Sequence, residues 1–305
     1  MKTRLLSHMA AATVPLLTLQ VLLAVAAGAR ASAVADGPGT PSVRYSLAAL
    51  ADTDNGVDLL EDGSDQALRV RLWGRVEPGG SVVIVVGGVG HTAAEFDFDD
   101  GSPPTGRPMS LPQQARALRQ AAVDQGLHPP AVIAFLGYDA PPNIVSAVDA
   151  GPIRTGAANL ATLTAAVNQL EGDLQTTWVC HSYGSLVCAS AMFTDRPEER
   201  PSQVVLIGSP GIHLDRADQA PPGITLYAGR GDHDSIGLTP ALGLLHGSFG
   251  VDPSRPAFGA HPIPTDPGTG HSDYYRPGST QLTAIATVAA TPADEALSQD
   301  SESRR

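Results

Sequence analysis

The segment Cys180–Ser185 contains the serine best placed to act as a nucleophile. It reads Cys-His-Ser-Tyr-Gly-Ser, follows the apolar run 176–179 and precedes a second run of apolar residues. A buried strand, a sharp turn with serine at its tip and then a helix form a nucleophile elbow, which exposes the serine hydroxyl beside backbone N–H groups. Ser182 is therefore the predicted nucleophile; the alternative is that it only caps a helix. Gly184 fits the usual Gly-x-Ser-x-Gly pattern, whereas Cys180 replaces its first glycine.

A serine hydroxyl needs a base, usually histidine, and that histidine needs a carboxylate to orient it. In the strand, elbow and helix architecture the acid follows the serine and precedes the histidine. The apolar run 224–228 ends in Gly-Arg-Gly-Asp-His-Asp, which places acids on a glycine-rich loop at the end of a strand. We predict Asp232 as the orienting acid. Asp234 is the alternative, because residues two apart on an extended loop point the same way.

The predicted base is His271, in the segment Gly-His-Ser-Asp-Tyr-Tyr. This segment lies in a loop rich in glycine and proline, just before a helical pattern that starts near Ser279. The competing histidines fit less well. His261 precedes a proline in a stretch typical of an edge strand, and His233 adjoins the predicted acid.

Acyl transfer also needs two N–H donors that face the developing oxyanion. One is the amide of Tyr183, the residue after the nucleophile. The other is expected from the glycine loop that follows the apolar run 82–86, where we predict Val89, with Gly88 as the alternative. The glycine loop lacks the Gly-Lys-Ser/Thr ending and the spacing of nucleotide-binding loops, which argues against a phosphate cradle.

The two cysteines of the chain lie on either side of the predicted elbow. Cys180 lies two residues before Ser182 on the strand, and Cys188 lies on the helix face that packs against that strand. Their heights along the two elements agree to roughly 1 Å, so a disulfide is geometrically possible. Two buried thiols are the alternative.

The elements that position these residues alternate between strands and helices. Apolar residues recur at helical spacing in 111–126 and 160–172, and each of these segments ends at a glycine. Leu68, Val70 and Leu72 alternate with Arg69, Arg71 and Trp73, which predicts a half-exposed edge strand at 68–73. Continuous apolar runs, typical of parallel strands covered on both faces, recur at 82–86, 131–136, 176–179, 204–207 and 224–228. We predict an α/β fold with a doubly wound, mostly parallel sheet and a site at the carboxyl ends of its strands. Only residues 209–224 separate two of these strands, which leaves no room there for a large lid domain.

Five motifs in order resemble the α/β-hydrolase superfamily, and more narrowly an actinobacterial group of serine hydrolases without an established substrate. The resemblance spans roughly residues 55–290 and implies that Ser182, Asp232 and His271 match the family's triad. Cys180 is a departure from it. The motifs are the elbow His-Ser-Tyr-Gly, Gly88–Gly90, Phe135–Pro141, Ile207–Gly211 and Gly270–Tyr274.

The ends of the chain differ in character from its middle. Residues 1–33 have a basic start, a short apolar core and small residues, as in a secretory signal peptide that is cleaved and leaves no membrane span. The alternative is an uncleaved anchor, although the apolar run falls short of the roughly 20 residues that span a bilayer. Residues 34–65 are predicted to be a loosely ordered lead-in, 66–290 the hydrolase domain and 291–305 a disordered tail. The net charge of −12 disfavours binding to nucleic acid.

The sequence therefore predicts an exported serine hydrolase that cleaves carboxylic esters, acts on a small-molecule or lipid-like acyl substrate and needs no cofactor. The same triad also serves amidases, peptidases and acyltransferases, and a non-catalytic exported binding protein is a further alternative. A metal site built from Asp232, His233 and Asp234 with His91 or His261 is less favoured, because these residues lack a strict ligand spacing.

Overall fold

The structure is a computed structural model that describes residues 43–46, 56–61, 65, 67–98, 108–143, 146–170, 173–237 and 250–292. The predicted signal peptide at 1–33 lies outside the described residues, as do most of the lead-in and nearly all of the predicted tail. No helix in the described ranges is long and apolar enough to cross a bilayer.

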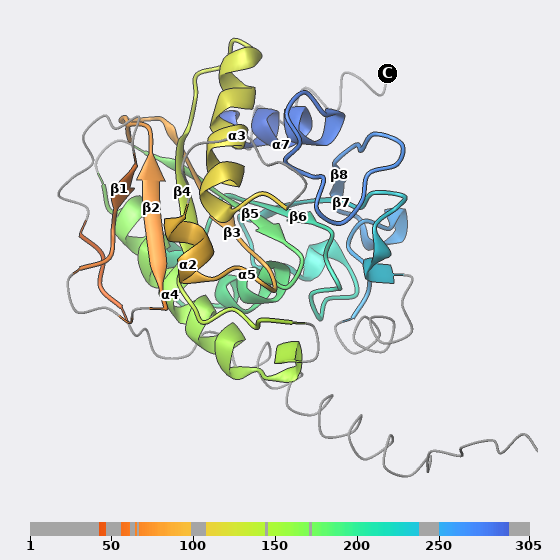
Figure 1. Ribbon diagram of the computed structural model, residues 1–305, viewed down its shortest axis with the longest axis horizontal. Helices are drawn as coiled ribbons and strands as arrows, with labels where there is room; N and C mark the ends of the chain where they lie inside the picture. Colours follow the sequence, from red (N-terminus) through yellow and green to blue (C-terminus); the bar gives the residue numbers. More distant parts are fainter. Residues whose placement is uncertain are drawn as a thin grey trace, which may run out of the picture.

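The described residues form a twisted sheet with the strand order β1-β2-β4-β3-β5-β6-β7-β8. The pairings β1–β2 and β2–β4 are antiparallel, and all the others are parallel. This arrangement confirms the predicted fold class (Figure 1). The strands are β1 (Val57–Asp58), β2 (Arg69–Trp73), β3 (Ser81–Val86), β4 (Ala131–Leu136), β5 (Gln175–His181), β6 (Gln203–Ile207), β7 (Thr225–Gly229) and β8 (His261–Pro262).

Two predictions at the start of the sheet are corrected. β2 shows the predicted alternation of burial, but β1 pairs along its outer side, so β2 is not the edge strand. β1 also lies inside the predicted lead-in, and the sheet therefore begins before residue 66. A strand of two residues is too short to leave a periodic pattern in the sequence.

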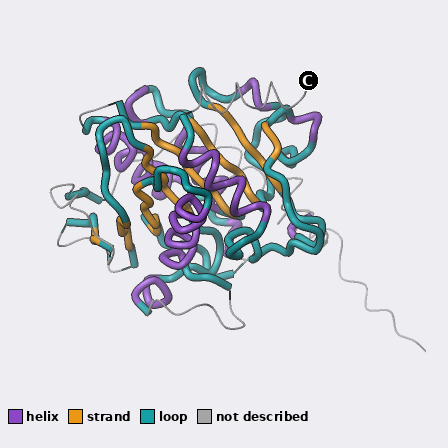
Figure 2. The backbone as a smooth tube through the Cα atoms, turned by 90° about the horizontal axis from the view of Figure 1, so that it is seen from above, coloured by secondary structure: helices purple, strands orange, loops and turns teal. Residues whose placement is uncertain are grey.

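Helices cover the sheet in two layers (Figures 1 and 2). α3 (Leu111–Asp124) packs on β4 and on α7 (Thr280–Ala290), and α7 in turn contacts β3. α4 (Gly151–Asn168) packs against α5 (Gly184–Met192), and both contact β5. The short α2 (Ala93–Asp97) follows the glycine loop after β3. Single turns of 3-10 helix occur at Ser146–Val148, Pro197–Glu199, Ala217–Gln219, Ser235–Gly237 and Pro256–Phe258.

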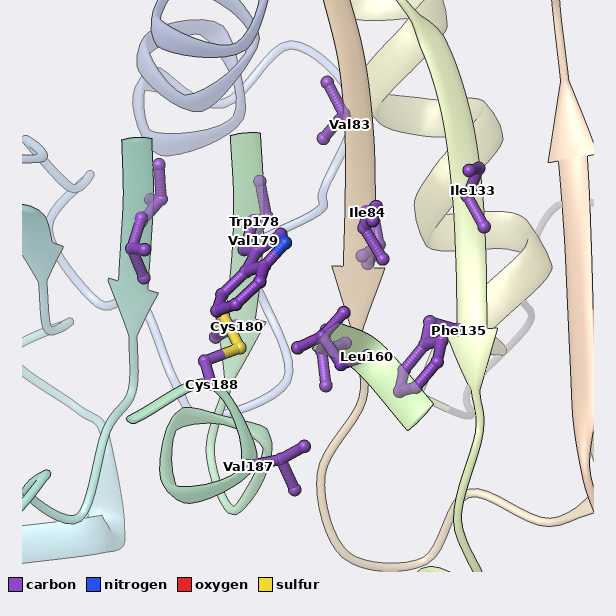
Figure 3. Close-up of a cluster of buried hydrophobic side chains, with 14 of the residues drawn as sticks. Val83, Ile84, Ile133, Phe135, Leu160, Trp178, Val179, Cys180, Val187 and Cys188 are labelled. Carbon is purple, nitrogen blue, oxygen red and sulfur yellow. A yellow bond between two sulfur atoms is a disulfide. The ribbon is translucent and has the colours of Figure 1, made fainter. Parts of the chain in front are cut away.

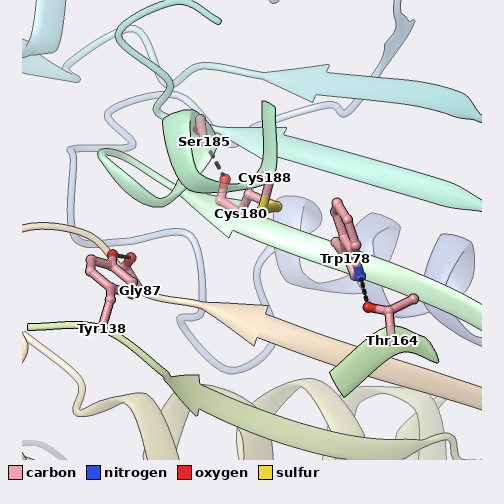
Figure 4. The surroundings of a disulfide bond; sticks show 7 residues. All are labelled: Gly87, Tyr138, Thr164, Trp178, Cys180, Ser185 and Cys188. Atoms are coloured by element: carbon pink, nitrogen blue, oxygen red, sulfur yellow. Dashed lines mark hydrogen bonds between the residues drawn. A yellow bond between two sulfur atoms is a disulfide. The ribbon is translucent and has the colours of Figure 1, made fainter. Parts of the chain in front are cut away.

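The core lies between the sheet and these helices, and its centre is the strand that leads to Ser182. Every residue of α5 is buried, since this helix is enclosed by β5 and α4. Trp178 of β5 and Leu160 of α4 belong to this cluster of buried side chains (Figure 3). The Trp178 indole N–H donates to the hydroxyl of Thr164 of α4 at 3.0 Å (Figure 4). The turn that carries Ser182 is therefore held between two elements of the packed core. Between β6 and β7 the chain forms only a short turn at Ala217–Gln219, in agreement with the absence of a large lid there.

Candidate active site

Ser182 occupies a strained turn between β5 and α5. Its φ of +55° lies in the left-handed region, which residues with a Cβ rarely adopt. The turn also requires glycine at 184, because a Cβ there would lie 2.6 Å from the carbonyl oxygen of Gly87. These features are those of a nucleophile elbow, in which backbone strain projects the serine hydroxyl from the end of the sheet.

The structure brings Ser182, His271 and one acid into a continuous hydrogen-bonded chain. His271 Nε2 lies 2.9 Å from Ser182 Oγ, and His271 Nδ1 lies 2.8 Å from Asp234 Oδ1. An ionised carboxylate only accepts hydrogen bonds, so Nδ1 carries the ring proton and Nε2 is free to accept from the serine hydroxyl. His271 is thus held in the tautomer of a general base.

Asp234, and not Asp232, is the acid that orients His271, so the first-choice prediction is wrong. The chain does not stay extended after β7, because the Asp234 N–H donates to the Gly231 carbonyl at 3.1 Å and closes a turn. The turn directs the two carboxylates to different places. Asp232 accepts from the N–H of Gly268 at 2.8 Å in an exposed position, whereas the Asp234 side chain is fully buried.

The other candidate histidines lie elsewhere. The backbone N–H of His233 donates to the Thr269 carbonyl at 3.1 Å, which fixes the loop that contains His271. His261 belongs to the edge strand β8 and its ring lies 5.2 Å from that of Tyr227, between centroids. Neither therefore takes the place of His271. Within the described ranges, no group of three metal-binding side chains is close enough to hold an ion.

Tyr274 is a site residue that sequence reasoning missed. Its hydroxyl donates to Asp234 Oδ2 at 2.5 Å and accepts from the Gly231 N–H at 3.0 Å. Burial, followed by the nearby Asp234 carboxylate, raises the pKa of Tyr274, so the phenol stays protonated and donates. The sequence motif His-Ser-Asp-Tyr predicts a role for its histidine, but nothing in its spacing indicates which hydroxyl reaches the acid.

Asp234 stays ionised although it is buried. Burial alone would raise its pKa, but hydrogen bonds from His271, Tyr274 and the backbone of Ile236 outweigh it, and the pKa of Asp234 is lowered. The lowered pKa keeps a negative charge beside the imidazole at neutral pH. A fixed negative charge at this position is the feature that would stabilise a protonated imidazole ring.

Both predicted oxyanion loops border the same cleft as Ser182 and His271. This cleft has a volume of about 520 Å³ and is lined by Ser182 and His271 together with Gly88, Val89 and Tyr183. Gly88 approaches Ser182 closely, since a Cβ on it would lie 2.8 Å from Ser182 Cβ. The buried Tyr138 hydroxyl donates to the Gly87 carbonyl at 2.6 Å and holds this glycine loop in place.

A disulfide joins Cys180 to Cys188 and confirms the bridge that the sequence made geometrically possible (Figure 4). The Cα atoms lie 6.6 Å apart, and both residues are fully buried. The bridge ties the end of β5 to α5 across the turn that carries Ser182. It therefore supports the elbow at the position where the usual pattern has a glycine.

Replacing both cysteines with alanine is expected to lower stability without changing the fold. A crosslink between residues eight apart is worth roughly 2–3 kcal/mol in the chain-entropy model. For a domain of this size, that loss lowers Tm by about 5–10 °C. Thermal unfolding of the double variant beside the oxidised wild type measures the difference. An unchanged Tm would show that the bridge contributes nothing to stability.

Comparison with known proteins gives one family. The model of the family described as "Alpha/beta hydrolase" matches residues 62–244, which includes the elbow and the acid loop. Among curated proteins, the chain is 31% identical to the uncharacterized protein Rv2079 of Mycobacterium tuberculosis over 210 residues, 59% of this chain and 32% of that protein. It is 39% identical to the uncharacterized protein Rv0963c of the same species over 133 residues, 40% of this chain and 47% of the relative. The chain thus spans less than half the length of either relative.

The solved structures that match most of the chain share little sequence with it. The carboxylesterase EstE1 from a metagenomic library has a TM-score of 0.44 and 12% identity, over 89% of this chain and 98% of the other. A protein of unknown function from Agrobacterium tumefaciens, titled a putative α/β hydrolase, has a TM-score of 0.43 and 14% identity, over 80% of this chain and 97% of the other.

Proposed function

Because the chain belongs to the α/β-hydrolase family, we propose that it hydrolyses carboxylic esters with Ser182 as nucleophile, His271 as base and Asp234 as orienting acid. The observation that carries this proposal is the unbroken chain of hydrogen bonds from Ser182 Oγ through the His271 ring to Asp234. A binding protein without catalysis has no need of a strained serine aligned with a base, which favours the enzyme over that alternative.

The first half of the reaction transfers the acyl group to the enzyme. Ser182 Oγ attacks the ester carbonyl while His271 Nε2 takes the hydroxyl proton, and a tetrahedral oxyanion forms. The N–H groups of Val89 and Tyr183 are the proposed donors to that oxyanion. The intermediate then collapses, the C–O bond to the alcohol breaks, and His271 returns the proton to the departing alkoxide.

The second half repeats these steps with water. His271 takes a proton from a water molecule, the resulting hydroxide attacks the acyl carbon, and the bond to Ser182 Oγ breaks as His271 reprotonates it. The products are a carboxylic acid and regenerated enzyme. Every proton in this cycle passes through His271 Nε2, and the chemistry needs no cofactor.

The walls of the cleft favour an acyl group that is largely apolar. Val89, Met109, Ala147 and Ile236 line it together with the ring of Tyr275. Such side chains bind hydrocarbon by removing it from water, with roughly 0.8 kcal/mol gained for each buried CH₂. We therefore propose a small-molecule or lipid-like acyl ester as the substrate.

We also propose that the protein works outside the cytoplasm. The predicted leader at 1–33 supports export. The disulfide between Cys180 and Cys188 supports it independently, because such bonds persist in oxidising compartments and are rare in the cytosol.

Covalent labelling tests the proposed nucleophile and reaction class together. A fluorophosphonate probe should label the protein, and peptide mapping should place the label on Ser182, because this probe forms a stable bond with an activated serine. The same preparation should hydrolyse p-nitrophenyl esters, with p-nitroanilides of matched acyl chains as the comparison for amidase activity. A label on another residue, or faster cleavage of the anilides, would contradict the proposal.

A further inference from the structure

His181 is the last residue of β5 and stands directly before the nucleophile. Its side chain is half-buried and borders the cleft, but the proposed chemistry gives it no role. The ring Nε2 lies 2.8 Å from the backbone carbonyl oxygen of His271. A carbonyl oxygen only accepts, so Nε2 carries the proton and donates. The residue beside Ser182 is therefore bonded to the backbone of the proposed base, 90 positions away in sequence.

The surroundings of His181 keep it neutral and fixed in place. Its ring lies 4.7 Å from the His271 ring and 5.5 Å from the Tyr274 ring, between centroids. Burial, followed by the neighbouring His271 and His91, lowers the pKa of His181 to about 3. A charged His181 would disfavour the imidazolium form of His271, whereas a neutral ring provides a hydrogen bond without that repulsion.

His271 makes hydrogen bonds with Ser182 Oγ and Asp234 through its ring and with His181 through its backbone carbonyl. These three bonds do not all survive the reaction. Once Ser182 Oγ carries the acyl group, it has no proton to donate, and the bond from Ser182 to Nε2 is lost. The Asp234 contact still orients the ring, but Asp234 belongs to the loop after β7. The bond from His181 then still ties the backbone of His271 to the end of β5, directly before the acylated serine.

We propose that His181 is a positioning residue that holds His271 beside Ser182 in the acyl-enzyme, so that the base can activate water for deacylation. This inference rests on the proposed esterase function and adds a role that the triad does not supply. The position of the base matters most at this stage, because the serine hydroxyl no longer helps to align it.

The test compares His181→Phe, which keeps an aromatic ring and removes the donor, with His181→Gln, which keeps a side-chain N–H. With a p-nitrophenyl ester, His181→Phe should lower kcat by about tenfold, the effect of one lost hydrogen bond. Because deacylation becomes slower than acylation, KM should fall with kcat, kcat/KM should change by less than about threefold, and a burst of p-nitrophenol should appear. His181→Gln should restore most of kcat. His128→Phe, at an exposed histidine paired with Glu77, is the matched control and should behave as wild type.

Three kinetic results would overturn the inference: wild-type kcat in His181→Phe, equal losses in kcat and kcat/KM, or no rescue by glutamine. Failure of the esterase proposal is recognised separately, by wild-type protein that neither turns over esters nor labels at Ser182. In that case NMR of Ser182→Ala provides the test without a substrate. The Nδ1 proton of His271 should give a slowly exchanging low-field signal that adding His181→Phe removes, and its survival would also overturn the inference.

Discussion

Ser182→Ala is expected to lower kcat for ester hydrolysis by at least about a thousandfold, and by up to about 10⁶-fold if the triad acts as a unit. The variant lacks the oxygen that forms the acyl-enzyme, so a bound ester can react only with water. The cleft and the oxyanion donors remain, and with them a small residual rate. Steady-state kinetics with a p-nitrophenyl ester measure the loss, and thermal unfolding verifies that the variant is folded.

Ser185→Ala is the matched control for this substitution. Ser185 lies three residues further on, in the first turn of α5, and its hydroxyl reaches the Cys180 carbonyl at 3.4 Å, not the base. The same atom is removed from the same buried region, so kcat should stay within about threefold of wild type while stability falls by roughly 1 kcal/mol. Full activity in Ser182→Ala would rule out Ser182 as the nucleophile, whatever the control shows.

The sequence predicts the fold well because its signals are local. Five continuous apolar runs correspond to β3 through β7, since strands buried on both faces need apolar side chains at every position. The helix expected at 111–126 is α3, and the one expected near Ser279 is α7, with Ser279 as its N-cap. α4 begins at Gly151, before the predicted 160, because its first turns bear small residues without a clear apolar stripe.

Ser182 and His271 are predictable for a similar reason, because each lies in a short motif whose order along the chain is characteristic. The orienting acid is not predictable in this way, because a turn in the chain after β7 decides which carboxylate faces His271. Asp232 and Asp234 look equivalent in the sequence. The hydrogen bond from the Asp234 N–H to the Gly231 carbonyl closes a turn, and this turn points their carboxylates in different directions. Tyr274 and His181 are harder still. Their contacts join segments 40 and 90 positions apart, so they follow from the assembled sheet and from no local pattern.

Asp234→Asn is expected to lower kcat by about 10⁴-fold, whereas Asp232→Asn should change it by less than about threefold. The asparagine at 234 has nearly the same shape as the aspartate but lacks the charge that stabilises the His271 imidazolium. If its NH₂ group faces Nδ1, it also favours the tautomer with the proton on Nε2, which cannot accept from Ser182. At 232 the lost charge belongs to an exposed carboxylate whose contact is the Gly268 N–H.

The two variants are close controls for each other. They make the same chemical change in one loop, two residues apart, so any general effect of removing a negative charge from this acidic protein is common to both. A difference between them therefore reports direct contact with His271, which the structure gives to Asp234 at 2.8 Å. Equal and mild losses would mean that neither carboxylate orients the base. A larger loss of kcat in Asp232→Asn would mean that the loop after β7 is extended and brings Asp232, instead of Asp234, to the imidazole of His271.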